Sequence, residues 1–515
     1  MLFEQPISTQ PFNRWFLRDR ENRRLLLLGG MAIILQFIVF KFFYPYPNFM
    51  PPDSYSYLDA AYQNLTINMW AIGYSKFLRL FSSFTISSVA LVWFQYLLLQ
   101  ISLLYFLFSV RYLLAPKKWV FRVLLGITIL NPLMPHISNF IGSDTLFTAL
   151  SLIWFTQLLW ILYSPNLQLL LWHSLVLLLA FMVRYNALYF PLLSMTLITF
   201  AHLRLKIKAI GIATIIFLIG GFIVRTEYEY YRETKTIQFS AFGGWQIAAN
   251  ALYGYAYALQ DDPRTIPTRF RNLQALVNHH MDSLNQIPYV MRPDKDVAVY
   301  YLWDFKSPLR VYMERKWSGD TAIPYFNQWA SMAPLYASYG RWLILHHSIS
   351  FIQYYIWPNF IKYYVPPTGF MGSYNLGNDH VDRIAVIWFK WPSNKINQRF
   401  NVKEIEIAQI FPVFLAIVNL VFVLSIITFA ILKGFKKCSV LSKRIIKLII
   451  VVWISNMLFS VVAAPIELRY QLFPMVITVS FTELLLAFLI SEANAKNSSS
   501  ERLGIHLKDE YQLLN

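Results

Sequence analysis

The sequence predicts an all-α polytopic membrane protein with about 10–13 transmembrane helices. Of its 515 residues, 57% are hydrophobic and only 14% are charged, whereas soluble domains carry about a quarter charged residues. The mean hydropathy is +0.43. Apolar runs close to the length of about 20 residues that a spanning helix needs lie at 25–44, 87–110, 119–134, 144–163, 168–183, 186–203, 208–225, 409–432, 445–464 and 471–491.

The basic residues that give the net charge of +18 are placed in a pattern set by these runs. Their placement indicates membrane topology rather than a nucleic-acid partner. Lys and Arg gather in alternate connections, as the positive-inside rule expects of cytoplasmic loops. The segments 1–24 and 492–515 are therefore predicted to be cytoplasmic, and the polar tail is expected to be loose. The basic clusters are Arg14, Arg18, Arg20, Arg23 and Arg24; Arg111, Lys117 and Lys118; Arg204, Lys206 and Lys208; and Lys433, Lys436, Lys437, Lys443, Arg444 and Lys447.

The same topology divides the rest of the chain. An N-terminal transmembrane module, 25–225, contains the first outer loop, 45–86. An extracytoplasmic segment of mixed structure, 226–408, precedes the C-terminal transmembrane helices, 409–491. The stretch 341–365 is apolar but interrupted by His, Pro and Lys, so it either lies along the membrane surface or hides one or two more spans.

Two acids stand at predicted outer ends of spans. Asp53, in "PPDSYSYLDAA", follows two prolines and precedes a helical pattern. Asp144, in "GSDTLF", leads into a span. Each side chain either caps its helix without further chemistry or belongs to a site that both acids face.

Two arginines stand at the same predicted face. Arg184 lies in "FMVRYNALYF", between two apolar runs, and Arg469 lies in "APIELRYQLFPM", beside Glu467 and Tyr470. Either side chain is an anchor that reaches to the membrane surface or a phosphate ligand, because guanidinium matches phosphate oxygens in a bidentate fork. The chain has no P-loop, no HExxH and no dinucleotide fingerprint.

The ordered set "PPDSYSYLDAA", "MWAIGYSKFL", "GSDTLF", "RYNALYF" and "ELRYQLFP" resembles the GT-C superfamily of integral-membrane glycosyltransferases. The nearest branch is that of the protein O-mannosyltransferases and the aminoarabinose transferase of lipid A. The resemblance covers roughly 25–225 and 409–491, whereas 226–408 matches in position only. Ala71 stands where proline is common in that family.

The resemblance implies an inverting glycosyltransferase that takes a sugar from a polyprenyl-phosphate donor. Asp53 would be the general base, Asp144 the second catalytic acid, and Arg184 and Arg469 the ligands of the donor phosphate. The remaining substrate-binding residues that it implies are Tyr55, Glu467 and Tyr470.

The resemblance leaves several properties open. The acceptor is a lipid, a polysaccharide or a protein, and no cofactor follows, although some members of the superfamily use a divalent metal. The expected location is a bacterial inner membrane with the site facing outward. The main alternative is a transporter or flippase of lipid-linked sugars, and a further one is a non-catalytic scaffold. The sequence shows no internal repeat, and we expect no acid in the middle of a span, which argues against transport.

Overall fold

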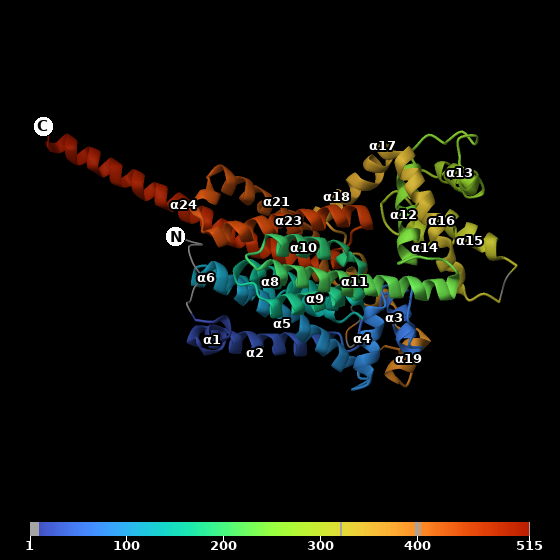
Figure 1. The fold of residues 1–515 in the computed structure, drawn as a ribbon, viewed down its shortest axis with the longest axis horizontal. Helices are drawn as coiled ribbons and strands as arrows, with labels where there is room; N and C mark the ends of the chain where they lie inside the picture. The colour runs from blue at the N-terminus through green and yellow to red at the C-terminus, as the bar shows by residue number, and fades with distance from the viewer. Residues whose placement is uncertain (1–9, 320–321, 397–399, 401–402, 514–515) are drawn as a thin grey trace.

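The computed structural model describes residues 10–319, 322–396, 400 and 403–513, and residues 1–9 of the expected N-terminal segment lie outside this part. The described residues form helices and irregular connections without a β-strand, so the all-α class is confirmed. Figure 1 shows a bundle of long helices with a group of shorter helices at one end, which we call the loop end. The helix α1 (Phe12–Arg18) lies at the opposite end of the bundle, and the C-terminal part of α24 (Leu472–Leu513) projects beyond that end.

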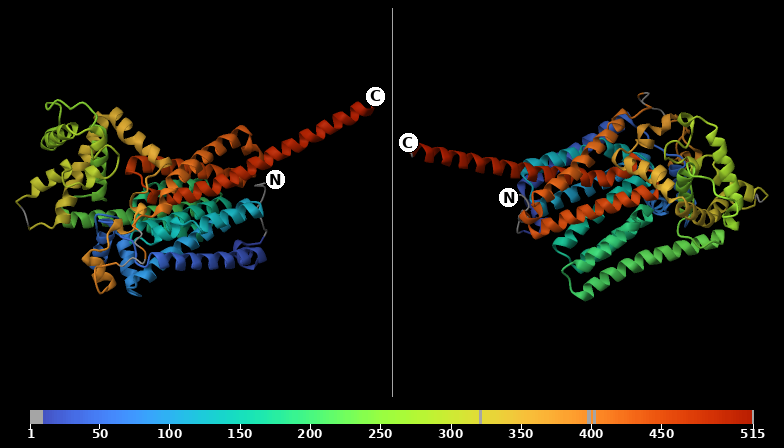
Figure 2. Two further views of the ribbon diagram at one scale, coloured as in Figure 1. Left: turned by 180° about the vertical axis from the view of Figure 1, so that it is seen from behind. Right: turned by 90° about the horizontal axis from the view of Figure 1, so that it is seen from above.

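Eight helical segments of the described chain are long and apolar enough to cross a membrane. Several of them, α11 above all, leave most of their apolar residues uncovered by protein, and Figure 2 shows α11 at the edge of the bundle. Lipid is the environment that such surfaces fit. The eight segments are α2 (Arg20–Phe43), α5 (Ser88–Leu114), α6 with α7 (Lys118–Ile129 and Leu133–Ser138), α8 (Ser143–Tyr163), α11 (Leu205–Thr234), α20 with α21 (Glu406–Gln409 and Phe411–Ile431), α23 (Val440–Ala463) and the 3₁₀ turn η7 with part of α24 (Leu468–Gln471 and Leu472–Leu513).

Two predicted spans form helices shorter than any of these eight segments. The run at 168–183 forms α9 (Leu167–Val183), which has 17 residues. The run at 186–203 begins as a 3₁₀ turn, η1 (Tyr185–Tyr189), and continues as α10 (Phe190–Phe200). Pro191 lies in the first turn of α10, where proline is tolerated, although its ring disfavours helix before it.

The loop end is built from shorter helices. The stretch 341–365 belongs to this group and contributes no candidate span. At the opposite end lie α1 (Phe12–Arg18) and α22 (Gly434–Lys437). The helices of the loop end are α3 (Asp53–Tyr62), α4 (Gly73–Ser82), α12 (Ala241–Tyr255), α13 (Arg271–Asn285), α14 (Tyr300–Trp303), α15 (Pro308–Trp317), α16 (Tyr325–His346), α17 (Ser348–Phe351), α18 (Trp357–Tyr364) and α19 (Arg383–Phe389).

Two helices run past the boundaries that the sequence suggested. The helix α11 continues beyond residue 225 to Thr234, where Tyr230 donates a hydrogen bond to the carbonyl of Asn68 at 2.8 Å. The helix α24 continues beyond 491 to Leu513, so the polar tail is helical over these residues, and Figure 1 shows it projecting beyond the bundle. A helix needs no apolar face to extend from a stable span, because propagation costs less than nucleation.

The loop end has a core of its own, centred on α12 and α16. Trp245 and Trp329 stack at 5.4 Å between ring centroids, and both are almost fully buried. A Cβ atom at Gly244 would lie 2.2 Å from the carbonyl oxygen of Ala333, so only glycine lets the two helices approach this closely.

Two asparagines of the loop end hold the end of α23. Buried Asn359 donates to the carbonyls of Val461 and Ala464 at 2.7 and 2.8 Å and accepts from the backbone N–H of Ile466 at 2.9 Å. Asn250 donates to two further carbonyls of that helix end. The loop-end helices thus satisfy the orphan carbonyls of α23 and fix the segment that leads into η7.

Candidate active site

Three segments that are distant in sequence bring charged side chains together at the loop end. Asp53 is the first residue of α3, Asp144 is the second residue of α8, and Arg469 lies in η7. Nη1 of Arg469 lies 3.1 Å from Oδ2 of Asp53 and 3.7 Å from Oδ2 of Asp144. The two acids that the sequence placed at outer span ends therefore share one arginine.

Neither acid caps its helix. The N-cap positions are Pro52 for α3 and Gly142 for α8, and no side chain makes a capping hydrogen bond at either helix start. The interpretation of Asp53 and Asp144 as simple caps is therefore wrong in this structure. Both carboxylates turn toward guanidinium groups instead.

Arg184 forms an ion pair with Asp144 from the C-terminal end of α9. Only its Nη1 is used, and its other N–H groups make no hydrogen bond to any residue that the structure describes. Its guanidinium also packs against the Tyr470 ring, 4.8 Å from the centroid. Arg184 thus keeps hydrogen-bond donors for a ligand.

Arg469 is fully engaged by the protein. Its Nε donates to Glu467 at 2.9 Å, its Nη1 to Asp53, and its Nη2 to the hydroxyl of Tyr470 at 2.6 Å. Its guanidinium lies over the Tyr470 ring at 4.7 Å and over Phe370 at 5.2 Å. Arg469 therefore organises the cluster, whereas Arg184 is the arginine with donors to spare.

Asp53 and Asp144 differ in how well they are satisfied. Asp144 is 3% exposed and has an arginine at each carboxylate oxygen. Asp53 is 17% exposed. Among the described residues it accepts one side-chain hydrogen bond, from Arg469 to its Oδ2, so its Oδ1 has no partner there. Burial raises the pKa of Asp53, and this effect outweighs the opposing attraction of Arg469.

A cavity of about 350 Å³ opens beside the cluster, within the size range of small-molecule binding sites. Charged residues form one part of its wall, and aromatic and apolar residues from α12, α14 and the first loop form another. The residues that line it include Asp53, Tyr57, Trp70, Arg184, Asn186, Phe242, Gln246, Trp303, Glu467, Arg469 and Tyr470.

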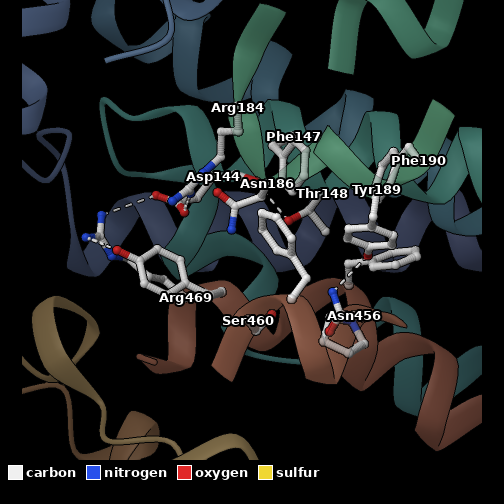
Figure 3. Close-up of a pocket in the computed structure, with 14 residues that line it drawn as sticks. Asp144, Phe147, Thr148, Arg184, Asn186, Tyr189, Phe190, Asn456, Ser460 and Arg469 are labelled. Atoms are coloured by element: carbon white, nitrogen blue, oxygen red, sulfur yellow. Dashed lines mark hydrogen bonds and ion pairs between the residues drawn. The ribbon is translucent and has the colours of Figure 1, made fainter. Parts of the chain in front are cut away.

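A narrow crevice continues from the cluster between the spans. Figure 3 shows Asp144, Arg184, Asn186 and Arg469 toward one end of it, with Tyr189 and Phe190 toward the other. Its free volume is about 20 Å³, and its walls come from α8, η1, α10, α23, η7 and α24. The crevice and the cavity share Arg184, Asn186, Ser460, Arg469 and Tyr470.

Six of the seven site residues that the sequence suggested lie in this cluster, and Tyr55 does not. Tyr55 stacks on Phe49 at 5.4 Å and does not line the cavity. Tyr57 lines the cavity instead, and its hydroxyl lies 3.1 Å from that of Ser143. The spacing of four residues from Asp53 was the missed signal, because residues i and i+4 share one helix face.

The cluster does not fit a metal centre. Asp53, Asp144 and Glu467 each face a guanidinium group rather than one another across an empty site. Among the described residues no group of three or more His, Cys, Asp or Glu side chains is placed to hold a metal ion. The chemistry of the site is therefore that of carboxylates and arginines.

Gly73, in the motif "MWAIGYSKFL", positions the first loop against the end of α9. A Cβ atom at Gly73 would lie 2.5 Å from the carbonyl carbon and oxygen of Met182, two residues before Arg184. Because the opposing atoms are backbone, they cannot swing aside. Glycine at this position therefore lets α4 pack directly beneath the backbone that carries Arg184.

Comparisons of the chain with family models, with curated proteins and with solved structures return no match. The function is accordingly inferred from the residues of the site.

Gly73→Ala should lower the stability of the purified protein by about 1–3 kcal/mol, because the added methyl group overpacks a backbone contact. Gly30→Ala is the matched control, since Gly30 lies within α2 and a Cβ atom there meets nothing within 4 Å. The measurement is the midpoint of thermal unfolding in detergent. Equal midpoints for the two variants would contradict the close packing of α4 on α9.

Proposed function

We propose that the protein is a glycosyltransferase that moves a sugar from a polyprenyl-phosphate donor to an acceptor hydroxyl at the outer face of the membrane. The observation that carries the proposal is the cluster of Asp53, Asp144, Arg184 and Arg469 at the loop end, in which Asp53, Arg184 and Arg469 line one cavity and Asp144 pairs with both arginines. It combines an incompletely satisfied carboxylate with an arginine that has free donors. Such a transfer requires both groups.

Asp53 is the candidate general base. Its free Oδ1 and its place on the cavity wall suit it to take the proton of an acceptor hydroxyl, a contribution typically worth about 10²–10⁴-fold in rate. Asp144 suits this task less well because both of its oxygens face arginines. Its role in the proposal is to hold Arg184 and Arg469 in place.

The proposed reaction is a single displacement. The acceptor oxygen attacks the anomeric carbon, the bond from that carbon to the phosphate oxygen breaks, and the proton of the acceptor passes to Asp53. The sugar passes through a state resembling an oxocarbenium ion, and attack from the face opposite the phosphate inverts the anomeric centre. The products are the glycosylated acceptor and polyprenyl phosphate.

The charges of the cluster suit this reaction. With Asp53, Asp144 and Glu467 ionised against two guanidinium groups, the cluster carries one negative charge. It becomes neutral when Asp53 takes the proton, while the departing phosphate gains negative charge. Arg184 supplies fixed donors to that phosphate, and preorganised donors of this kind stabilise developing charge strongly in a dry site.

The crevice between the spans is the candidate path for the polyprenyl chain. Arg184 lines it, and its aromatic side chains include Phe147, Phe190 and Phe473. An isoprenoid chain needs apolar surface of this kind. Because the present free volume is about 20 Å³, these side chains would have to part when the lipid enters.

Glu483 favours the second candidate function, a transporter of lipid-linked sugars. It lies within α24, roughly 17 Å along the helix from Leu472, so the expectation that no acid lies within a span was wrong. Its Oε1 is buried without a hydrogen-bond partner among the described residues. Ionisable groups inside a membrane are often functional, but Glu483 does not line the cavity or the crevice.

Asp53→Asn should reduce sugar transfer by about 10²–10⁴-fold, because the amide cannot accept the proton. The measurement is transfer from radiolabelled polyprenyl-phosphate sugars in membranes that contain equal amounts of each variant. Glu483→Gln is the control and should retain transfer. Full activity of Asp53→Asn would remove the proposed base, and movement of lipid-linked sugar across the membrane, without transfer, that is lost in Glu483→Gln would favour the transporter.

Arg184→Ala should lower kcat/KM for the donor by about 10–100-fold, the usual loss when a charge-assisted hydrogen bond is removed. KM for the acceptor should change little, because the acceptor does not carry the phosphate. Arg225→Ala, which removes an exposed arginine of α11, is the control and should match the native protein. An unchanged dependence of rate on donor concentration would exclude Arg184 from the donor site.

The pH dependence of the rate should report the pKa of Asp53. The base acts only when ionised, so kcat/KM should fall with acidification through a midpoint above the ordinary aspartate value of about 3.9, because burial raises this pKa. Arg469→Gln should move the midpoint upward, since the positive charge of Arg469 lowers the pKa of Asp53. An acid limb that stays at the same pH in Arg469→Gln would contradict this electrostatic coupling.

A further inference from the structure

Three aromatic side chains form a continuous wall of the cavity away from the arginines. Trp70 comes from the first loop, Phe242 from α12 and Trp303 from α14. Trp70 lies 4.8 Å from Phe242 and 5.6 Å from Trp303 between ring centroids, and Phe242 lies 6.3 Å from Trp303. All three residues line the cavity. We call this group the aromatic wall.

The aromatic wall is not simply part of the hydrophobic core. The nearby core aromatics Trp245 and Trp329 are at most 1% exposed, whereas Trp70, Phe242 and Trp303 are each only partly buried. Aromatic rings that face an open cavity leave apolar surface in water, which is unfavourable unless a ligand covers it. The wall therefore has the character of a binding surface.

Polar groups accompany the rings. The ring of Trp70 lines the cavity, whereas its indole Nε1 is buried and has no hydrogen-bond acceptor among the described residues. Gln246 donates through Nε2 to Asn250 at 2.7 Å, which leaves its carbonyl oxygen for a ligand. Asn186 lines the same cavity. Rings with hydrogen-bonding groups at their edges suit a molecule that has C–H faces and hydroxyl edges.

We propose that the aromatic wall binds a sugar ring of the acceptor, so that the acceptor is a saccharide or glycoconjugate. This inference rests on the proposed transfer reaction and names its acceptor class. The C–H face of a pyranose is weakly positive and packs against the negative face of an aromatic ring. Its equatorial hydroxyls then reach outward to hydrogen-bonding groups that line the cavity, such as the carbonyl of Gln246.

A peptide acceptor fits this cavity less well. Extended peptides are commonly held by backbone hydrogen bonds to a free strand edge, and the part of the chain described here contains no β-strand. The donor sugar also fits the wall less well. It is attached to the phosphate and so belongs next to Arg184, at the end of α9, whereas the aromatic wall belongs to α12, α14 and the first loop.

Binding can be tested without the donor. Full-length protein in lipid nanodiscs is mixed with a panel of methyl glycosides and disaccharides, or with a short serine- and threonine-containing peptide, and contacts are read by saturation-transfer NMR. We expect signals from at least one saccharide, and a roughly two- to tenfold weaker affinity in Trp303→Ala.

Phe242→Leu should also weaken saccharide binding, and it guards against the case in which Trp303→Ala alone misfolds. Trp357→Ala, which removes an exposed aromatic outside the cavity, should bind as the native protein does.

Three outcomes would overturn the proposal: binding of the peptide alone, no binding of any saccharide in the panel, or equal saccharide affinity in Trp303→Ala and Trp357→Ala. In the transfer assay, Trp303→Ala should raise KM for the acceptor and leave KM for the donor unchanged. A raised KM for the donor alone would assign the wall to the donor sugar and reject the inference.

The failure of this inference is distinguishable from failure of the proposed function. Asp53→Asn tests transfer alone, and saccharide binding is compared among the native protein, Trp303→Ala and Trp357→Ala, all of which retain Asp53. Saccharide binding through Trp303 in a protein that transfers no sugar would contradict the transferase. Transfer that depends on Asp53, with saccharide binding indifferent to Trp303, would contradict the aromatic wall alone.

Discussion

The structure of the loop end depends on one electrostatic requirement, the mutual compensation of buried arginines and carboxylates. Arg469 is 8% exposed and touches Asp53, Asp144 and Glu467. A charge buried without a partner costs several kcal/mol, and removal of one member of a buried pair typically costs about 3–5 kcal/mol. The segments that carry these residues are therefore held together at one point, although the first loop and η7 lie at opposite ends of the chain.

This requirement explains why the site needs both parts of the fold. The helices α8 and α9 bring Asp144 and Arg184 to the loop end. Asn359 of α18 holds the carbonyls at the end of α23 and so fixes the segment that leads into η7, which carries Arg469. The cavity then lies between the charged bundle end and the aromatic residues of α12 and α14. In the proposed reaction the charged side holds the donor phosphate and the base, and the aromatic side holds the acceptor.

The all-α membrane class and the positions of most long helices could be predicted from the apolar runs and their lengths, because a helix that crosses lipid must be apolar over about 20 residues. The interruptions were less predictable: the apolar run at 186–203 contains the turn η1, and α24 extends far beyond its apolar part. The charged site residues Asp53, Asp144, Arg184 and Arg469 could be predicted, because a charge at the end of an apolar run is costly near lipid and so stands out in the sequence. The resemblance implies Tyr55, whereas the helix phase of α3 places Tyr57, four residues after Asp53, on the cavity wall. The aromatic wall could not be predicted, because Trp70, Phe242 and Trp303 meet only through tertiary packing.

The central claim is that a single carboxylate, Asp53, assists direct displacement of a lipid-linked phosphate. The anomeric configuration of the product tests this claim most directly. Native protein is supplied with a polyprenyl-phosphate sugar of known configuration and an acceptor, and the new glycosidic linkage is assigned by NMR. One displacement with Asp53 as base predicts inversion at the anomeric carbon. Retention of configuration would require a covalent intermediate on a second group and would contradict the account, as would the absence of any transferred sugar.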